Sequence, residues 1–177
     1  MLESERLYIR LIESSDIDDV YDYVGNPEVM KYEKDQYMTR DSLMNLITYF
    51  KEHKSMYVVM LKDEPKVIGQ VYLGKTNPTF NNEYNLGYIF NPDYHSKGYC
   101  TEACREIMRY GFEELQVNRI RAACNPENTP SWKVMEKLGM TKEAHFKKKV
   151  HFRDDALGNP IYTDEYVYAM NITEWKQ

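Results

Sequence analysis

The pattern of apolar and polar residues divides the chain into short strand-like segments and four helix-like segments. Strand-like patterns, rich in β-branched and aromatic residues, occur at 6–11, 56–61, 67–74, 83–90, 120–124, 141–152 and 161–170. Helix-like spacing of three and four begins after residue 15, at Thr39, after residue 98 and at Thr129. The order of these segments predicts a mixed α/β layer with about seven strands and about four helices.

The residues that follow the strand 83–90 have the features of a phosphate-binding turn. They read Asn-Pro-Asp-Tyr-His-Ser-Lys-Gly-Tyr-Cys-Thr-Glu-Ala and lead into a helix whose apolar stripe is Ala103, Ile107, Met108, Gly111, Phe112 and Leu115. Such a turn exposes backbone N–H groups where the helix begins, and the helix dipole adds about half a positive charge there. This arrangement suits a pyrophosphate. A Walker-type loop is excluded because Lys97 precedes Gly98, and the GxGxxG fingerprint is absent.

A second segment, after the strand 120–124, opens another helix. It reads Asn-Pro-Glu-Asn-Thr-Pro-Ser-Trp-Lys-Val-Met-Glu-Lys-Leu-Gly-Met, with Asn128 and Ser131 near the expected helix start. Thr129 can cap this helix, and Gly139 can end it in a left-handed conformation.

These two segments resemble motifs A and B of the GNAT acetyltransferases. Motif A binds the pyrophosphate of coenzyme A through the backbone amides of a Q/R-x-x-G-x-G/A turn, and the branch with Lys-Gly-Tyr-Ala-Thr-Glu-Ala is the most similar. His95, Ser96 and Cys100 depart from that pattern, and the matching positions are Gly98, Thr101, Glu102 and Ala103. Motif B, Asn-x-x-Ser, corresponds to Asn128 and Ser131. The resemblance is to the ribosomal-protein-alanine N-acetyltransferase-like branch and covers nearly the whole chain.

The resemblance implies one GNAT domain over residues 1–177, with a mostly antiparallel sheet whose fourth and fifth strands, 83–90 and 120–124, splay apart. It implies acetyl-CoA as the cosubstrate, with the pantetheine arm paired to the fourth strand as an added strand. The residues that it places at the cofactor are Tyr88, Ile89, Phe90, His95, Ser96, Lys97, Gly98, Tyr99, Cys100, Thr101, Asn128 and Ser131. We therefore expect an N-acetyltransferase that transfers the acetyl group directly in a ternary complex.

Acetyl transfer to an amine needs a base for the ammonium group and a proton for the departing thiolate. Glu83 is a candidate base, with a solvated charge at a strand start as its alternative role. Asn85 stands where many members of this branch carry a glutamate. The tyrosine that family members use as an acid is replaced by Met135, which leaves Ser131 as the acid or as a helix-start residue that bonds the backbone. The alternative function is a non-catalytic acyl-CoA-binding sensor.

The resemblance places the amine acceptor between the loop 25–37 and the final hairpin around 145–160. Tyr32, Glu33 and Tyr37 are candidate substrate-binding residues, and with Asp154 and Asp155 they would favour a cationic amine. A protein N-terminus, an amino acid, a polyamine and an antibiotic all stay open, because the fold does not choose among acceptors. Family habit also predicts a homodimer, joined by a strand edge or by the final hairpin.

Composition and charge limit which binding partners and which cellular compartment we expect. A net charge of −5 argues against non-specific nucleic-acid binding, which needs a basic surface. No apolar run approaches the ~20 residues of a membrane-spanning helix, and the N-terminus lacks the features of a signal peptide, so we expect a cytoplasmic protein with no membrane partner. Cys100, Cys104 and Cys124 form neither an even disulfide set nor a CxxC pair, so we expect free thiols and no metal site.

Overall fold

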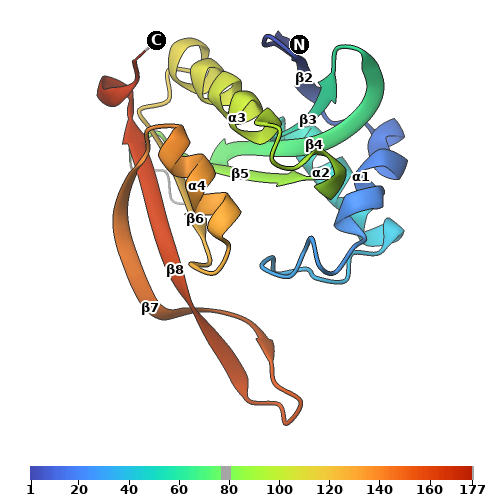
Figure 1. Ribbon diagram of the computed structural model, residues 1–177, viewed down its shortest axis with the longest axis vertical. Helices are drawn as coiled ribbons and strands as arrows, with labels where there is room; N and C mark the ends of the chain where they lie inside the picture. Colours follow the sequence, from blue (N-terminus) through green and yellow to red (C-terminus); the bar gives the residue numbers. More distant parts are fainter. Residues whose placement is uncertain (77–80, 177) are drawn as a thin grey trace.

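The computed structural model describes residues 1–76 and 81–176, and in this part of the chain one mixed sheet carries helices on both faces (Figure 1). The strands are β1 (Leu2–Glu3), β2 (Leu7–Leu11), β3 (Met56–Leu61), β4 (Glu64–Lys75), β5 (Glu83–Phe90), β6 (Arg119–Cys124), β7 (Thr141–Asp154) and β8 (Pro160–Asn171). The helices are α1 (Ile17–Val24), α2 (Arg40–His53), α3 (Tyr99–Arg109) and α4 (Thr129–Lys137).

The strand order across the sheet is β1-β2-β3-β4-β5-β6-β8-β7. Among the described residues, every neighbouring pair is antiparallel except β5 and β6, which are parallel. The expected mixed α/β fold with a mostly antiparallel sheet is confirmed. The sheet has eight strands rather than about seven, because the two-residue β1 pairs with β2 at the sheet edge.

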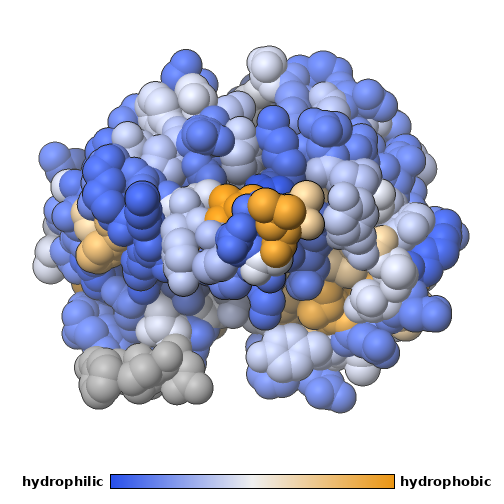
Figure 2. Space-filling model, turned by 90° about the horizontal axis from the view of Figure 1, so that it is seen from below, coloured by the Kyte–Doolittle hydropathy of each residue, from blue (hydrophilic) through white to orange (hydrophobic). Residues whose placement is uncertain are grey.

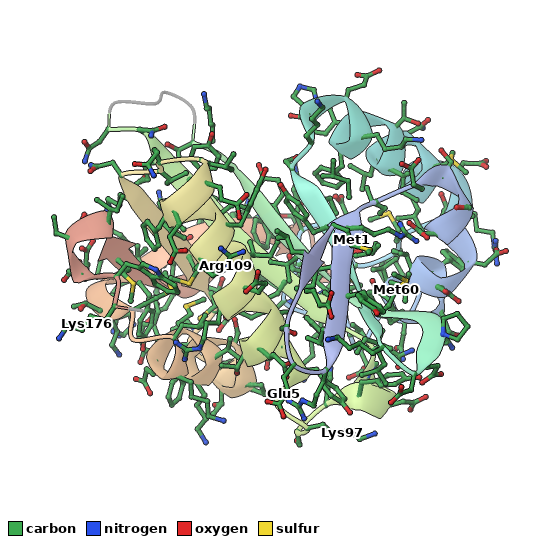
Figure 3. The ribbon with its side chains drawn as sticks, turned by 90° about the horizontal axis from the view of Figure 1, so that it is seen from above. Met1, Glu5, Met60, Lys97, Arg109 and Lys176 are labelled. Atoms are coloured by element: carbon green, nitrogen blue, oxygen red, sulfur yellow. The ribbon has the colours of Figure 1, made fainter. Side chains whose placement is uncertain are left out.

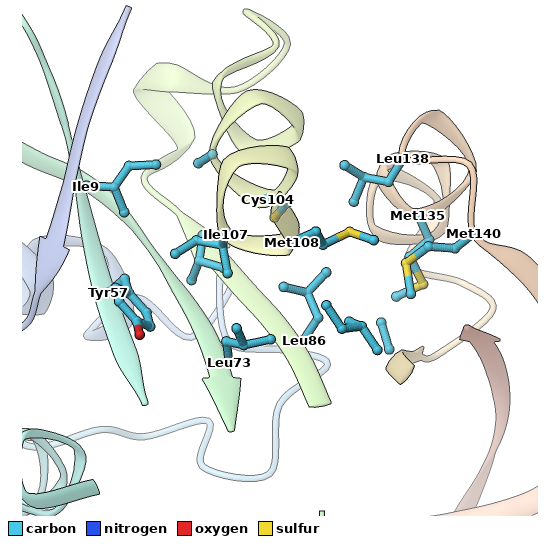
Figure 4. Packing of buried hydrophobic residues seen from close by; sticks show 14 of the residues in the cluster. Ile9, Tyr57, Leu73, Leu86, Cys104, Ile107, Met108, Met135, Leu138 and Met140 are labelled. Carbon is cyan, nitrogen blue, oxygen red and sulfur yellow. The ribbon is translucent and has the colours of Figure 1, made fainter. Parts of the chain in front are cut away.

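Alternation along the central strands sends apolar side chains to both faces of the sheet and gives two cores. On β3, Tyr57 and Val59 belong to the core under α3 and α4, whereas Met56 and Val58 belong to the core under α1 and α2. Figure 4 shows Met108 of α3 between the sheet and α4, in the first of these cores. Burial of one such large apolar side chain contributes about 1.5–3 kcal/mol, so each core holds its helices firmly against the sheet.

Local sequence signals set most helix ends. Thr39 caps α2 as expected, because its hydroxyl oxygen accepts a hydrogen bond from a first-turn N–H at 3.1 Å, and Gly139 adopts the expected left-handed conformation after α4. Two expectations are wrong. Thr129 is the first residue of α4 rather than its cap. Leu115 is 40% exposed, because α3 continues into a π-helical turn over Tyr110–Glu114 that moves the last positions off the apolar stripe.

β5 and β6 separate after a short paired stretch, and this opens the sheet. In the described structure their parallel ladder consists of three residue pairs, Glu83 with Arg119, Tyr84 with Ile120 and Asn85 with Arg121. Beyond this ladder β5 stays paired with β4 through Phe90, and β6 stays paired with β8 through Cys124. The edge of β5 from Leu86 to Phe90 therefore faces a gap, and the expected splay of these two strands is confirmed.

β7 and β8 form a long hairpin whose tip extends away from the rest of the molecule (Figure 1). Large apolar side chains are exposed on this hairpin at Phe146, Phe152, Leu157, Ile161 and Tyr162. Figure 2 looks onto this end of the molecule and shows apolar surface near the centre of the view. β7 is also an edge strand, and the homodimer contact through a strand edge or this hairpin stays a prediction.

Candidate active site

The gap between β5 and β6 continues into a cleft of about 1380 Å³. Its walls come from the loop between α1 and α2, from β5, from the turn before α3, from the start of α4, and from β7 and β8. These segments are far apart in the sequence, and the splay of the two strands brings them around one space (Figure 1). The cleft thus has one side formed by the two predicted motifs and another formed by the α1–α2 loop and the final hairpin.

The turn before α3 contains two residues with a left-handed backbone. Ser96 has φ 62°, and Gly98, which directly precedes α3, has φ 85°. Glycine adopts this conformation without steric cost, whereas the Cβ atom of Ser96 makes it strained there. The Nε2 atom of His95 hydrogen-bonds the carbonyl oxygen of Phe90 at 2.8 Å and ties the turn to the end of β5. The first N–H groups of α3 have no carbonyl partner within the helix, so they remain available to an anion.

Ser131 lies on the wall formed by α4 and contacts β5 through Tyr88. The Ser131 hydroxyl donates a hydrogen bond to Tyr88 Oη at 3.3 Å, and Tyr88 Oη donates one to the Ser131 carbonyl oxygen at 2.7 Å. Burial raises the pKa of Tyr88 well above the usual value of a phenol. Burial also raises the pKa of the neighbouring Cys124 thiol to about 11. This wall therefore carries neutral hydroxyl and thiol groups near pH 7.

Comparison with known proteins assigns the chain to a family. Residues 6–141 match the family model described as an acetyltransferase (GNAT) domain. The chain belongs to this family. It is 37% identical over 179 residues to the uncharacterized N-acetyltransferase YnaD of Bacillus subtilis (strain 168), with 98% of each chain covered.

Solved structures agree with this assignment. The crystal structure of a GNAT-family acetyltransferase from Bacillus anthracis has a TM-score of 0.88 and 36% identity, and the match covers 98% of this chain and 99% of that one. A ribosomal-protein-S5-alanine acetyltransferase from Vibrio fischeri shares the fold, with a TM-score of 0.77, 24% identity and coverage of 99% and 98%. The GNAT resemblance of the two motifs is confirmed, and the protein is an N-acetyltransferase of the family that uses acetyl-CoA.

Most residues that the motifs assign to the cofactor line the cleft of this GNAT domain. They are Tyr88, Ile89, Phe90, His95, Ser96, Gly98, Tyr99, Cys100, Thr101, Asn128 and Ser131. Lys97 does not line it, because its ammonium group donates to the carbonyl oxygen of Asp93 at 3.0 Å and lies over the ring of Tyr94. The backbone and small side chains of the turn thus face the cleft, while its cation points elsewhere.

The two candidate catalytic residues near the start of β5 lie outside the cleft. Glu83 forms an ion pair with Arg119 at 2.7 Å, and Arg119 also pairs with Glu143. Asn85 occupies the last position of the paired ladder, opposite Arg121. Both residues precede the point where the strands separate, so their side chains do not reach the splayed edge. Glu83 is a partner in an ion-pair network rather than a freely solvated charge.

The candidate acceptor residues of the α1–α2 loop separate into two groups. Tyr32 and Glu33 line the cleft, and the Tyr32 hydroxyl donates to the Glu127 carbonyl oxygen at 3.3 Å, which links the loop to the start of α4. Glu33 is open to water within the cleft, but the surrounding protein partly desolvates its carboxylate and raises its pKa. Tyr37 is 82% exposed and does not line the cleft.

Sequence reasoning missed the carboxylates of β8 that line the cleft, among them Glu165. Glu165 has 17% of its side chain exposed and pairs with the ammonium group of Lys149 at 2.7 Å. Its neighbours Thr163 and Asp164 line the cleft as well, so the alternation of the strand alone does not single out Glu165. Other acidic residues line the cleft from elements distant in the sequence, among them Glu33 and Glu127.

Two negative findings apply to the described residues only. None of the helices there is long and apolar enough to cross a membrane. No group of three or more His, Cys, Asp or Glu side chains comes together there in the way that a bound metal ion requires.

Proposed function

We propose that the protein transfers the acetyl group of acetyl-CoA to a primary amine by direct attack in a ternary complex. The observation that carries this proposal is the open edge of β5 beside the turn at Gly98. An added strand can pair with such an edge through main-chain hydrogen bonds, which is the interaction that a pantetheine arm offers. The left-handed turn and the free N–H groups of α3 supply the adjoining pyrophosphate site.

The residues of the cleft fit coenzyme A by their backbone geometry. Tyr88, Ile89 and Phe90 would pair with the pantetheine arm, and the amides that follow Gly98 would hold the pyrophosphate. Acetyl-CoA supplies the thioester that the amine attacks. A backbone N–H on the open edge of β5 would polarise the thioester carbonyl, since fixed donors stabilise the negative charge that develops on that oxygen.

Two side chains would handle the protons. Ser131 lies on the cleft wall and would donate its proton to the thiolate once its hydroxyl rotates from Tyr88 Oη toward the sulfur, and water would then reprotonate the serine. Glu33 would bind the cationic acceptor and take up the proton that the amine must lose. Its raised pKa makes it a stronger base than an ordinary carboxylate. We assign the base to Glu33 rather than to Glu83, because the Glu83 carboxylate forms an ion pair with Arg119.

The acceptor would be a protein N-terminus or a small-molecule amine. Glu33 would favour a cation, and the apolar residues Phe50 and Phe152, which also line the cleft, would accommodate a carbon skeleton. An enzyme named for a ribosomal-protein alanine acceptor shares the fold, which supports testing N-terminal peptides first.

A panel of amines tests this function. Thiol release from acetyl-CoA would be measured with N-terminal peptides, amino acids, polyamines and aminoglycosides, and Tyr37→Phe would serve as a control because Tyr37 lies outside the cleft. We expect saturable release with at least one acceptor and wild-type rates in the control. Intact mass after incubation with acetyl-CoA alone should show no acetylated protein. Tight binding of acetyl-CoA without turnover on any acceptor would favour a sensor, and a covalent acetyl adduct would refute direct attack.

A further inference from the structure

The loop that leads into β2 is bound to the first turn of α3 by a group of short polar contacts. The carboxylate of Glu102 accepts hydrogen bonds from the Ser4 hydroxyl at 2.8 Å and from the Arg6 backbone N–H at 2.9 Å. It also accepts one from Arg6 Nε at 2.7 Å, and Arg6 Nη2 lies 2.6 Å from the same carboxylate. These contacts join residues almost one hundred positions apart in the sequence, so they are specific to the folded structure.

Arg6 also touches the turn itself. Its Nη1 atom donates to the Lys97 carbonyl oxygen at 3.1 Å, and its guanidinium lies over the Tyr99 ring, 4.5 Å from the centroid. A Cβ atom added to Gly98 would lie 3.4 Å from Arg6 Nη2, which places the cation directly beside the left-handed residue. Figure 3 shows the labelled Glu5 and Lys97 close together at one end of the molecule, where this loop meets the turn. Sequence reasoning assigned no role to Arg6.

The charge of Glu102 makes this contact important for an anionic ligand. A carboxylate in the first turn of a helix interacts favourably with the helix dipole, but it repels a pyrophosphate held at the same helix end. Burial pushes the pKa of Glu102 upward, yet the hydrogen bonds from Arg6 and Ser4 outweigh it and lower the pKa, so the carboxylate is ionised near pH 7. The site therefore contains a fixed negative charge, and Arg6 is the cation that pairs with it.

We propose that Arg6 is a positioning residue of the cofactor site: its guanidinium neutralises Glu102 beside the turn at Gly98, so that the turn can receive the pyrophosphate. This inference rests on the proposed coenzyme A site. A residue that only supported the fold would have the same effect whatever the charge of residue 102. The proposed effect of Arg6 on ligand binding instead depends on the negative charge of Glu102. Removing Arg6 alone leaves an uncompensated anion beside the ligand, whereas removing both charges does not.

Calorimetric titration with acetyl-CoA and with 3′-phospho-ADP, which carries the pyrophosphate without the pantetheine arm, tests the proposal. The variants are Arg6→Met, Arg6→Lys, Glu102→Gln and the double variant Arg6→Met with Glu102→Gln. Arg109→Met is the matched control, since Arg109 is 36% exposed against 43% for Arg6 and pairs with Glu106 at the opposite end of α3. A melting curve of each variant would establish that it is folded.

We expect Arg6→Met to weaken binding of both ligands about tenfold at low salt, and less at high salt because exposed charges are screened. Arg6→Lys, Glu102→Gln, the double variant and the control should stay within about threefold of the wild type. Unchanged binding in Arg6→Met would overturn the proposal. A double variant as weak as Arg6→Met would also overturn it, because the contact would then be mechanical only. Absence of binding in the wild-type protein would refute the cofactor site itself, which is a separate result.

Discussion

Replacing Ser131 with alanine tests whether the hydroxyl on α4 supplies the proton for the departing thiolate. A thiol has a pKa near 8.5, so its anion is a fair leaving group without help, and general-acid catalysis contributes ~10²-fold or somewhat more. We therefore expect Ser131→Ala to lower turnover by about 10²-fold, with residual activity above background. Affinity for acetyl-CoA should be unchanged, because the turn at Gly98 and the open edge of β5 do not depend on this hydroxyl.

Tyr88→Phe provides the matched variant for the same contact. It keeps the ring but removes the bond to Ser131 Oγ at 3.3 Å and the bond to the Ser131 carbonyl oxygen at 2.7 Å. A net hydrogen bond is worth about 1 kcal/mol, so we expect loss of orientation to lower turnover about fivefold. Because Tyr88 would act through Ser131, the double variant should be no slower than Ser131→Ala alone.

Single-turnover thiol release, calorimetry and melting curves separate this mechanism from a structural role. A helix-start serine that only bonded the backbone would cost about 1 kcal/mol of stability when removed and would leave the rate per folded molecule unchanged. The structure argues against that role, because the Ser131 hydroxyl donates to the side chain of Tyr88 rather than to a backbone group. Wild-type turnover together with a lowered melting temperature would refute the reasoning and leave water as the acid.

Three further predictions concern the turn, the acceptor side and assembly. Gly98→Glu should abolish coenzyme A binding in calorimetry, because a side chain at φ 85° is strained and adds a negative charge at the pyrophosphate site, and unchanged affinity would show that the turn is misassigned. Glu33→Gln should remove the rise of kcat/KM with pH that deprotonation of a carboxylate with a raised pKa produces, and an unchanged pH profile would exclude Glu33 as the base. Sedimentation should detect a homodimer, and a species of 21.1 kDa at all concentrations would contradict it.

The fold could be predicted well from the sequence because its signals are local. The strand, turn and helix around Gly98 lie within a continuous stretch, and the positive φ of Gly98 is a backbone requirement that a glycine expresses directly. The splay of β5 and β6 followed from the family resemblance rather than from hydrophobic periodicity. The wrong prediction that Leu115 belongs to the apolar stripe also has a local cause. The prediction assumed 3.6 residues per turn, and the π-helical turn before Leu115 does not have that period.

The catalytic assignments were harder, because they depend on partners that are distant in the sequence. Glu83 was a reasonable base for its place on the fourth predicted strand, but parallel pairing puts Arg119 beside it, and the resulting ion pair occupies the carboxylate. Arg6 was overlooked for the same reason, because Glu102 is its partner only after the first long strand meets α3. An ionisable residue can therefore be located on an element from the sequence, while its partner is decided by the packing of the elements.

The two sides of the cleft differ in what a sequence can reveal about them. In the proposed cofactor site, recognition would depend on main-chain groups of one turn and one strand edge, so the motif can still be identified despite the departures at His95, Ser96 and Cys100. On the acceptor side, Glu33 and Glu165 come from a loop and from the last strand, and each is one carboxylate among 28 acidic residues. Both line one cleft because of the splay and the fold of the final hairpin. The donor of the acetyl group can thus be inferred from a motif, whereas the acceptor has to be found by testing a panel of amines.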